Sequence, residues 1–257
     1  MHRYVGDMAL VIPMFPEHPW TNGRWQMAKV GTVSDAFYRL VRCIGRPAFA
    51  RSSRPVLLHA DRVPATGPVI VAANHLSPYD IPCLMGAIDR PLDFVSVVEM
   101  FRNPLVAWFF RHMNAFPLDR GRVDAATTRI ILDRLRRGRA VAMFPEGRIR
   151  QPHESMLVGG PVRLSVVRLA RLAGSPIVPG VILGTGVFSR ASAWKPVGRT
   201  KYAAAFGYPI LVDGQQDEAI ACAAAEAQLM AAYRDLYAEL SAASGLTVAD
   251  QPWRSTT

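Results

Sequence analysis

Lysine, cysteine and long apolar runs are scarce or missing in this sequence. Only 3 of its 30 basic residues are lysines, so arginine carries almost all of the positive charge. Its 3 cysteines lie far apart and are odd in number, which favours neither a disulfide framework nor a zinc site. We expect Cys43, Cys83 and Cys222 to be reduced core residues. No run of about 18 uncharged apolar residues is present, so we expect no helix that crosses a membrane.

The N-terminus also lacks a secretory signal. The apolar stretch MALVIPMFP, residues 8–16, is short and is interrupted by prolines, whereas a signal needs an unbroken apolar region behind basic residues. We therefore expect the protein on the cytoplasmic side of the cell membrane. If it meets the bilayer, it should lie on the surface as a peripheral protein.

The net charge of +10 indicates a partner that carries phosphate groups, such as lipid head groups, coenzyme A or nucleic acid. A bias towards arginine in the genome is an alternative explanation. Nucleic-acid binding is disfavoured because the sequence has no helix-turn-helix, zinc-finger or RNA-binding signature. Half of the 257 residues are hydrophobic, so the chain can bury one large core.

Short apolar runs alternate with helical patterns over most of the chain. The runs are rich in β-branched residues, and several are apolar throughout, which is typical of strands covered on both faces. They are residues 56–60, 68–73, 94–98, 140–144 and 177–183; the helical patterns cover residues 78–88, 104–112, 123–137 and 160–173. This alternation predicts an α/β fold in which helices flank a central sheet that is mostly parallel or mixed.

Helical patterns also stand at both ends of this body. A helix that begins at Ser34 would carry apolar side chains on one face and arginines elsewhere, so it could pack on the core or lie in a membrane interface. A long helix over residues 216–243 would end at Gly245. We therefore divide the chain into an N-terminal arm with the amphipathic helix, residues 1–49, and a main domain, residues 50–257.

The stretch NHLSPYD, residues 74–80, holds a histidine and an aspartate five positions apart, directly after a predicted buried strand. Ligand sites form at the carboxyl ends of strands in open α/β sheets. A turn could bring the Asp80 carboxylate onto the His75 imidazole, where it would fix the tautomer and stabilise the imidazolium of a general base. Alternatively, Asp80 could complete a capping box with Ser77 at the start of the next helix.

No enzyme nucleophile accompanies this pair. The sequence has no G-x-S-x-G elbow, and no cysteine has a context that suggests activation. A base at His75 would therefore have to activate a hydroxyl of a substrate. An acyl thioester is electrophilic enough for such a hydroxyl to attack it directly, so no covalent enzyme intermediate is needed.

Two further stretches place charged residues after apolar segments. In FPLDRGR, residues 116–122, Arg120 would emerge at the edge of the core, where an arginine can bind phosphate through two hydrogen bonds. In FPEGRIR, residues 144–150, Glu146 stands at a strand end and Gly147 permits a tight turn before two more arginines. The alternative for the first stretch is a surface salt bridge between neighbouring residues. The alternative for the second is a turn with a solvated acid. A fourth stretch, PIVPGV, is best interpreted as a plain core strand.

The order of these four stretches resembles the lysophosphatidic acid acyltransferase family, whose glycerolipid acyltransferases share four ordered blocks. The matches are Asn74, His75 and Asp80 for the first block, Phe116 to Arg120 for the second, Phe144 to Gly147 for the third and Ile177 to Pro179 for the fourth. The first and third blocks are specific at this spacing. The resemblance runs from about residue 50 to about residue 215.

The resemblance implies an enzyme that moves a fatty acyl group from acyl-CoA or acyl carrier protein to a hydroxyl of a glycerophosphate or lysophospholipid. It implies His75 as the base and Asp80 as the residue that orients it. The other implied site residues are Arg120, Arg148 and Arg150 as phosphate contacts, and Asn74, Glu146 and Gly147 as residues that position the substrate. No metal or other cofactor is implied, and the implied surroundings are membrane lipids.

The chain departs from the family pattern in two places. The third block usually continues Thr-Arg-Ser, whereas this chain has Arg148, Ile149 and Arg150. Many relatives carry a lysine two positions before the glutamate that aligns with Glu99, and this chain has Val97. One expected cation is therefore missing, so another lysolipid or a glycolipid is an alternative acceptor. A basic lipid-binding protein without catalysis is the alternative from another class, but it would not need a histidine base.

The segment PLVAWFFRHM, residues 104–113, is apolar on nearly every side of a helix. Insertion of two or three of its large side chains into a bilayer would give useful binding, at about 1.5–3 kcal/mol for each. Arginines near an anionic leaflet would add about 1 kcal/mol each. Burial of this helix against the sheet is the alternative, and the helix that begins at Ser34 is the competing membrane anchor.

Overall fold

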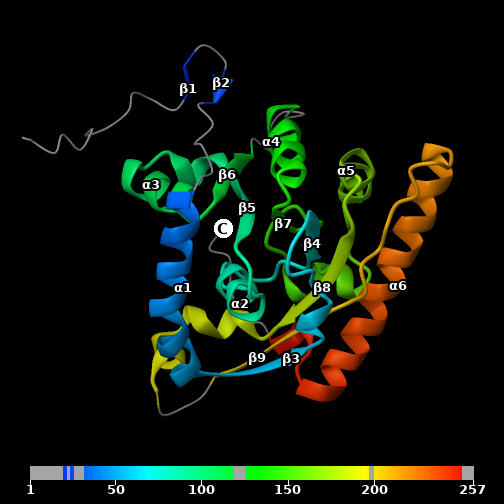
Figure 1. The fold of residues 1–257 in the computed structure, drawn as a ribbon. Helices are drawn as coiled ribbons and strands as arrows, with labels where there is room; N and C mark the ends of the chain where they lie inside the picture. Colours follow the sequence, from blue (N-terminus) through cyan, green and yellow to red (C-terminus); the bar gives the residue numbers. More distant parts are fainter. Residues whose placement is uncertain (1–19, 22–23, 26–31, 119–124, 197–199, 251–257) are drawn as a thin grey trace, which may run out of the picture.

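The computed structural model describes residues 20–21, 24–25, 32–118, 125–196 and 200–250. In this part of the chain a seven-stranded sheet carries helices on both faces (Figure 1). A second, two-stranded sheet pairs β1 (Trp20–Thr21) with β2 (Arg24–Trp25). The predicted α/β class, with a central sheet flanked by helices, is confirmed. The rest of the predicted N-terminal arm up to residue 31 lies outside the described residues.

The large sheet is mixed, and its strand order is β3-β9-β8-β4-β7-β5-β6. The strands are β3 (Ser53–Leu58), β4 (Val69–Ala73), β5 (Leu92–Val97), β6 (Ala115–Leu118), β7 (Ala140–Met143), β8 (Ile177–Leu183) and β9 (Thr200–Phe206). Neighbouring strands are parallel except β8 and β9, which are antiparallel. The carboxyl ends of the five strands from β8 to β6 in this order therefore meet at one edge of the sheet.

Strand β4 shows why the sheet is buried on both faces. All of its residues, VIVAA, are buried. Because side chains alternate along a strand, Val69, Val71 and Ala73 pack in one apolar cluster, whereas Ile70 and Ala72 pack in another. An uninterrupted apolar run is what a central strand between two layers of helices requires.

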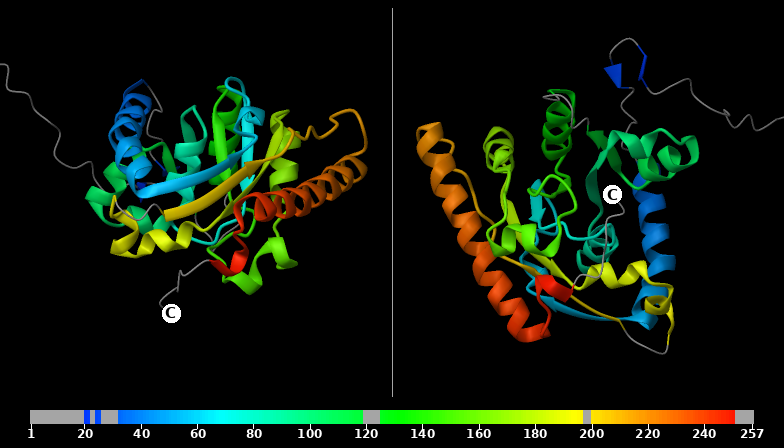
Figure 2. Two further views of the ribbon diagram at one scale, coloured as in Figure 1. Left: turned by 90° about the horizontal axis from the view of Figure 1, so that it is seen from below. Right: turned by 180° about the vertical axis from the view of Figure 1, so that it is seen from behind.

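Among the described residues, three α-helices cover each face of the sheet (Figure 1, Figure 2). On the Val71 side lie α1 (Thr32–Ser52), α2 (Asp80–Ala87) and α3 (Pro104–His112); on the Ile70 side lie α4 (Ala125–Arg136), α5 (Ser165–Ala173) and α6 (Glu218–Ser244). The described helices include none that combines the length and the apolar character needed to cross a membrane.

The predicted start of α3 and the predicted ends of α5 and α6 are confirmed. Asn103 caps α3, because its side chain accepts hydrogen bonds from the backbone N–H groups of Leu105 and Val106. Gly174 and Gly245 follow α5 and α6 in the left-handed conformation, with φ of 59° and 67°. Glycine adopts this conformation at little cost, so it ends a helix cleanly.

Three predictions about the fold are wrong in detail. Helix α2 begins at Asp80 and not beside Ser77, because residues 77–79 form a turn in which the Asp80 N–H donates to the Ser77 carbonyl at 3.2 Å. Helix α5 begins at Ser165 and not at residue 160, because the N–H groups of residues 160 and 163 donate to carbonyls of the preceding loop. Cys43 is exposed on α1, whereas Cys83 and Cys222 are buried, and all three are free thiols.

An ion network joins α1 to the amino edge of the sheet. Asp93 on β5 is fully buried, and its carboxylate accepts hydrogen bonds from Arg139 at 2.6 and 2.7 Å. The same guanidinium donates to Asp35 on α1 at 2.8 and 3.0 Å. Arg134 on α4 lies 3.3 Å from Asp93. Burial raises the pKa of Asp93 despite these arginines, whereas hydrogen bonds from Arg139 lower the pKa of Asp35.

Candidate active site

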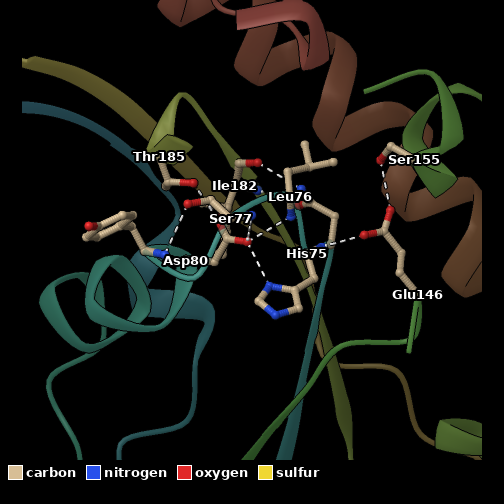
Figure 3. Close-up of polar contacts among 10 residues, drawn as sticks. His75, Leu76, Ser77, Asp80, Glu146, Ser155, Ile182 and Thr185 are labelled. Carbon is tan, nitrogen blue, oxygen red and sulfur yellow. Dashed lines mark hydrogen bonds and ion pairs between the residues drawn. The ribbon is translucent and has the colours of Figure 1, made fainter. Parts of the chain in front are cut away.

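His75 lies just beyond the carboxyl end of β4, where the chain turns towards α2. Its Nδ1 is 2.9 Å from Oδ2 of Asp80 (Figure 3). The carboxylate can only accept at this contact, so Nδ1 carries the proton of the neutral ring and Nε2 is left as an acceptor. The structure therefore brings together the two residues predicted from the first sequence block.

Asp80 is fully buried, and several groups hold its carboxylate in place. Oδ2 accepts hydrogen bonds from the backbone N–H groups of Leu76 and Ser77, both at 2.9 Å, and Oδ1 accepts one from the Thr185 hydroxyl. The two interpretations of Asp80 are therefore compatible. The carboxylate closes the turn before α2, as a capping residue would, and it also contacts the imidazole.

An aromatic ring covers one face of the His75 imidazole. The imidazole stacks on the ring of Phe144, which follows β7, with 4.0 Å between ring centroids and 15° between ring planes. Only 13% of the His75 side chain is exposed. Stacking on one side and the Asp80 contact at Nδ1 leave the ring little freedom, so Nε2 is held in one direction.

Glu146 is buried and ties three segments together. Its Oε2 accepts a hydrogen bond from the His75 N–H at 2.6 Å, and its Oε1 accepts one from the Ser155 hydroxyl at 2.8 Å (Figure 3). The same Oε1 also accepts from the Met156 N–H at 2.8 Å. Burial raises the pKa of Glu146, while the hydrogen bond from His75 is the largest opposing cause. The alternative of a solvated acid in a turn is therefore wrong, because only 1% of the residue is exposed.

Asn74 acts on the backbone that carries His75. It is fully buried, and its side-chain amide forms two hydrogen bonds with Ile182 on β8. Asn74 donates to the Ile182 carbonyl at 2.9 Å and accepts from the Ile182 N–H at 2.7 Å. The amide thus continues the pairing of β4 with β8 for one more residue, and it fixes the point at which His75 leaves the sheet.

The arginines of the third sequence block differ in their surroundings. Arg148 is exposed and pairs with Glu154 at 3.2 Å. The Arg150 N–H donates to the His75 carbonyl at 2.8 Å, and its guanidinium donates to the Glu146 carbonyl at 3.1 Å. Gly147 has a φ of 72°, as a tight turn requires. The remaining predicted phosphate contact, Arg120, lies outside the described residues.

Sequence reasoning did not predict three contributors to this site. Thr185, Ser155 and Phe144 contact Asp80, Glu146 and the His75 ring respectively. Thr185 comes shortly after β8 and Phe144 directly after β7, so their positions at the ends of the two strands that flank β4 were the available signal. Ser155 lies in a loop, and no pattern marks it.

A histidine with its Nδ1 held by a buried carboxylate, at the carboxyl edge of an α/β sheet, is an arrangement that can serve as a general base. No group of three or more histidine, cysteine, aspartate or glutamate side chains that could hold a metal ion gathers within the part of the chain that the structure describes.

Comparison with known proteins identifies the family. Residues 56–183 match the family model described as Acyltransferase. The 1-acyl-sn-glycerol-3-phosphate acyltransferase of Bacillus subtilis is 24% identical over 125 residues, which cover 48% of this chain and 60% of that protein. The lyso-ornithine lipid O-acyltransferase of Pseudomonas aeruginosa is 37% identical over 81 residues, which cover 31% of each chain.

The fold is also that of a solved acyltransferase. The crystal structure of the 1-acyl-sn-glycerophosphate (LPA) acyltransferase PlsC from Thermotoga maritima superposes with a TM-score of 0.60, at 24% identity, over 77% of this chain and 79% of that chain. Residues 56–183 of this chain therefore form a domain of the acyltransferase family. The chain spans 60% of the length of the Bacillus protein and 31% of the Pseudomonas protein.

Proposed function

We propose that this chain is an O-acyltransferase that moves a fatty acyl group from an acyl thioester to a hydroxyl of a glycerophosphate or lysophospholipid. The observation that carries the proposal is the 2.9 Å contact between Nδ1 of His75 and the buried Asp80 carboxylate. The similarity to curated 1-acyl-sn-glycerol-3-phosphate acyltransferases supports the choice of substrate class.

In the proposed reaction, Nε2 of His75 removes the proton from the acceptor hydroxyl. The oxygen forms a bond to the thioester carbonyl carbon, and a tetrahedral intermediate results. Its collapse breaks the carbon–sulfur bond, and the thiolate leaves with the proton returned by His75. Asp80 stabilises the imidazolium between these two proton transfers, which is how a buried carboxylate assists a histidine base. No acyl-enzyme forms, and no metal or other cofactor takes part.

The donor in this proposal is acyl-CoA or acyl carrier protein, and arginines bind phosphate. Arg150 stands beside the catalytic loop through its bond to the His75 carbonyl, which supports its assignment. Arg148 is half-exposed but already pairs with Glu154. Asn74, Glu146 and Gly147 position the substrate indirectly, because they fix the backbone on which His75 and these arginines lie.

We place the enzyme on the cytoplasmic face of the cell membrane as a peripheral protein. Exposed apolar side chains on α1 and α3 support this location: Leu40, Ile44, Leu105, Trp108 and Phe109. Phe37 on α1 packs edge-on against Trp108, with 5.3 Å between ring centroids, so the two candidate anchors form one surface. Arginines on α1 would add attraction to anionic lipids.

A different acceptor is a second candidate. Val97 stands where many relatives carry a lysine, and the Pseudomonas relative is named for a lyso-ornithine lipid. An acceptor with a head group other than a phosphate monoester would need fewer cations in the site. The chemistry at His75 would be unchanged.

A screen of purified protein on vesicles tests the proposal. Palmitoyl-CoA and palmitoyl carrier protein are paired in turn with glycerol 3-phosphate, lysophosphatidate, lysophosphatidylcholine and lyso-ornithine lipid, and products are measured by mass spectrometry. We expect thiol release that is matched by one new ester and depends on an acceptor. Vesicle binding without any new ester would support a lipid-binding protein that has no catalytic activity.

A further inference from the structure

Arg163 lies in the loop before α5, and its backbone is tied to the turn that carries Glu146. Its N–H donates to the Pro145 carbonyl at 2.8 Å. Its side chain lies across Gly147, so close that a β-carbon placed on Gly147 would stand 3.0 Å from Nε and 3.2 Å from Cζ of the guanidinium. The glycine therefore provides the space through which this cation passes over the turn.

Unlike the guanidinium groups of Arg148 and Arg150, that of Arg163 has no hydrogen-bond or ion-pair partner among the described residues. Arg148 pairs with Glu154 at 3.2 Å, and Arg150 donates to the Glu146 carbonyl at 3.1 Å. Arg163 is exposed, and within the described residues its side chain forms neither a hydrogen bond nor an ion pair. Its charge is thus available to an anion that enters the site.

The same turn connects Arg163 to the base. The Gly147 N–H donates to the Phe144 carbonyl at 2.9 Å and closes the turn. The Phe144 ring stacks on the His75 imidazole at 4.0 Å, and Glu146 holds the His75 N–H. His75 therefore contacts the first residue of one four-residue turn, and the Arg163 side chain lies over the last. Such a turn brings its first and last Cα atoms within about 7 Å of each other.

We infer that Arg163 binds the phosphate of the acceptor while His75 receives the proton of its hydroxyl. The inference rests on the proposed function. In a glycerophosphate the phosphate and the reacting hydroxyl stand on neighbouring carbons or nearly so, which suits a cation and a base that contact opposite ends of one short turn. A guanidinium binds phosphate oxygens through two parallel hydrogen bonds. Arg163 also offers a cation to a chain that has Val97 where many relatives have a lysine.

The test compares R163Q with the wild type and with R168Q. Arg168 on α5 is exposed and, within the described residues, has no side-chain partner, so its replacement is a matched loss of one charge. Losing a hydrogen bond to a charged group corresponds to about tenfold to a hundredfold in binding. We expect R163Q to raise the KM for lysophosphatidate by that factor. Its KM for palmitoyl-CoA and its kcat should stay within about twofold.

Three additional measurements sharpen the result. R163K keeps the charge and should recover part of the loss. With monoacylglycerol, an acceptor that lacks phosphate, R163Q and wild type should have the same kcat/KM. Calorimetric binding of glycerol 3-phosphate needs no turnover, so it tests Arg163 even if the acyltransferase proposal fails, and R163Q should bind it more weakly than R168Q does.

Several results would overturn the inference. One is an unchanged KM for lysophosphatidate in R163Q. Another is a rise in the KM for palmitoyl-CoA alone, which would assign the arginine to the phosphates of the donor. Equal losses in R163Q and R168Q would indicate a general effect of charge, and absence of glycerol 3-phosphate binding by the wild type would exclude the site.

Discussion

At the residue scale, Asp80 has two roles that the sequence left as alternatives. It closes the turn before α2, and it contacts the His75 imidazole. One carboxylate oxygen accepts from two backbone N–H groups of the turn and contacts Nδ1 of His75, and the other accepts from Thr185. A fully buried carboxylate needs this many donors, because burial of an unpaired charge is costly. The turn and the His75 imidazole are therefore held by the same carboxylate, and neither contact can be altered alone.

Glu146 holds the backbone N–H of His75, whereas Asp80 holds the His75 ring. Replacement by glutamine keeps the shape but leaves only one acceptor oxygen for three donors, so E146Q should lower the free energy of unfolding by about 1–3 kcal/mol. Turnover should also fall, because the His75 N–H loses its partner. Urea denaturation and initial rates measure the two effects. Full activity in a stable E146Q would contradict the role assigned to Glu146.

The difference in the free energy of unfolding between the wild type and E146Q should depend on pH in a definite direction. Burial raises the pKa of Glu146 above that of an ordinary glutamate, so its contribution to stability is present below the ordinary pKa and is lost as the pH rises through the raised one. The free energy of unfolding of the wild type relative to E146Q should therefore decrease from about pH 4 towards neutrality. E218Q, which removes an exposed glutamate from α6, is the control. A difference that grows with pH would contradict the account.

The sequence predicts the contact between His75 and Asp80 but not the residues that hold this pair in place. His75 and Asp80 stand close in the chain and next to a strand end, so local reasoning reaches them. Thr185 is 105 positions from Asp80, and the two meet only because β8 pairs with β4. The burial of Glu146 likewise depends on Ser155 and on α6 packing behind β4. Contacts of this kind follow from tertiary structure and have no local signal.

At the element scale, α1 and α3 form one apolar surface. Leu105 and Trp108 on α3 are 75% and 51% exposed, whereas Phe110 packs against the core. Leu40 and Ile44 on α1 are exposed as well. The two helices expected to compete as membrane anchors are therefore neighbours (Figure 1), and Phe110 contributes to folding.

Replacement of Leu105 and Trp108 by serine should weaken sedimentation with anionic vesicles at least tenfold. Each large side chain contributes about 1.5–3 kcal/mol when it leaves water, and about 1.4 kcal/mol is a factor of ten. Leu172 and Ile220, 66% and 64% exposed on α5 and α6 of the opposite face, provide the control double replacement. Equal losses in the two double variants would contradict a specific docking face.

Element prediction from sequence succeeds where the pattern is strong. The run IVPGVIL predicts β8 with its observed bounds. Strand β9, TKYAAAF, escapes prediction because alanine has little intrinsic preference for strands. It is extended because β3 and β8 pair with it on either side. Its alanines also leave room for the side chains that pack over it.

At the scale of the whole molecule, the two edges of the sheet have different tasks. The carboxyl edge carries His75, Glu146 and the arginines. The amino edge carries Asp93, which is fully buried among Arg134 and Arg139. Through Asp35 this network also fixes α1, so it anchors the proposed membrane surface to the sheet without touching the site.

Replacement of Asp93 by asparagine should destabilise the fold by about 3 kcal/mol, because it leaves buried Arg134 without its carboxylate partner and removes one of the two partners of Arg139. At temperatures where the protein remains folded, turnover should be retained, since the network lies at the opposite edge from His75. Urea denaturation measures the first effect. D89N removes an exposed acid paired with Arg42 and should cost less than about 1 kcal/mol. A loss in D93N no larger than that in D89N would contradict the structural role of the network.

The most direct test of the account is the rate of ester formation by H75A under the conditions in which the wild type is active. Loss of the base should lower kcat by at least about a hundredfold, while the midpoint of thermal unfolding stays within a few degrees of the wild type. An H75A protein that keeps more than about a tenth of the wild-type rate would contradict the assignment of His75 as the group that receives the proton.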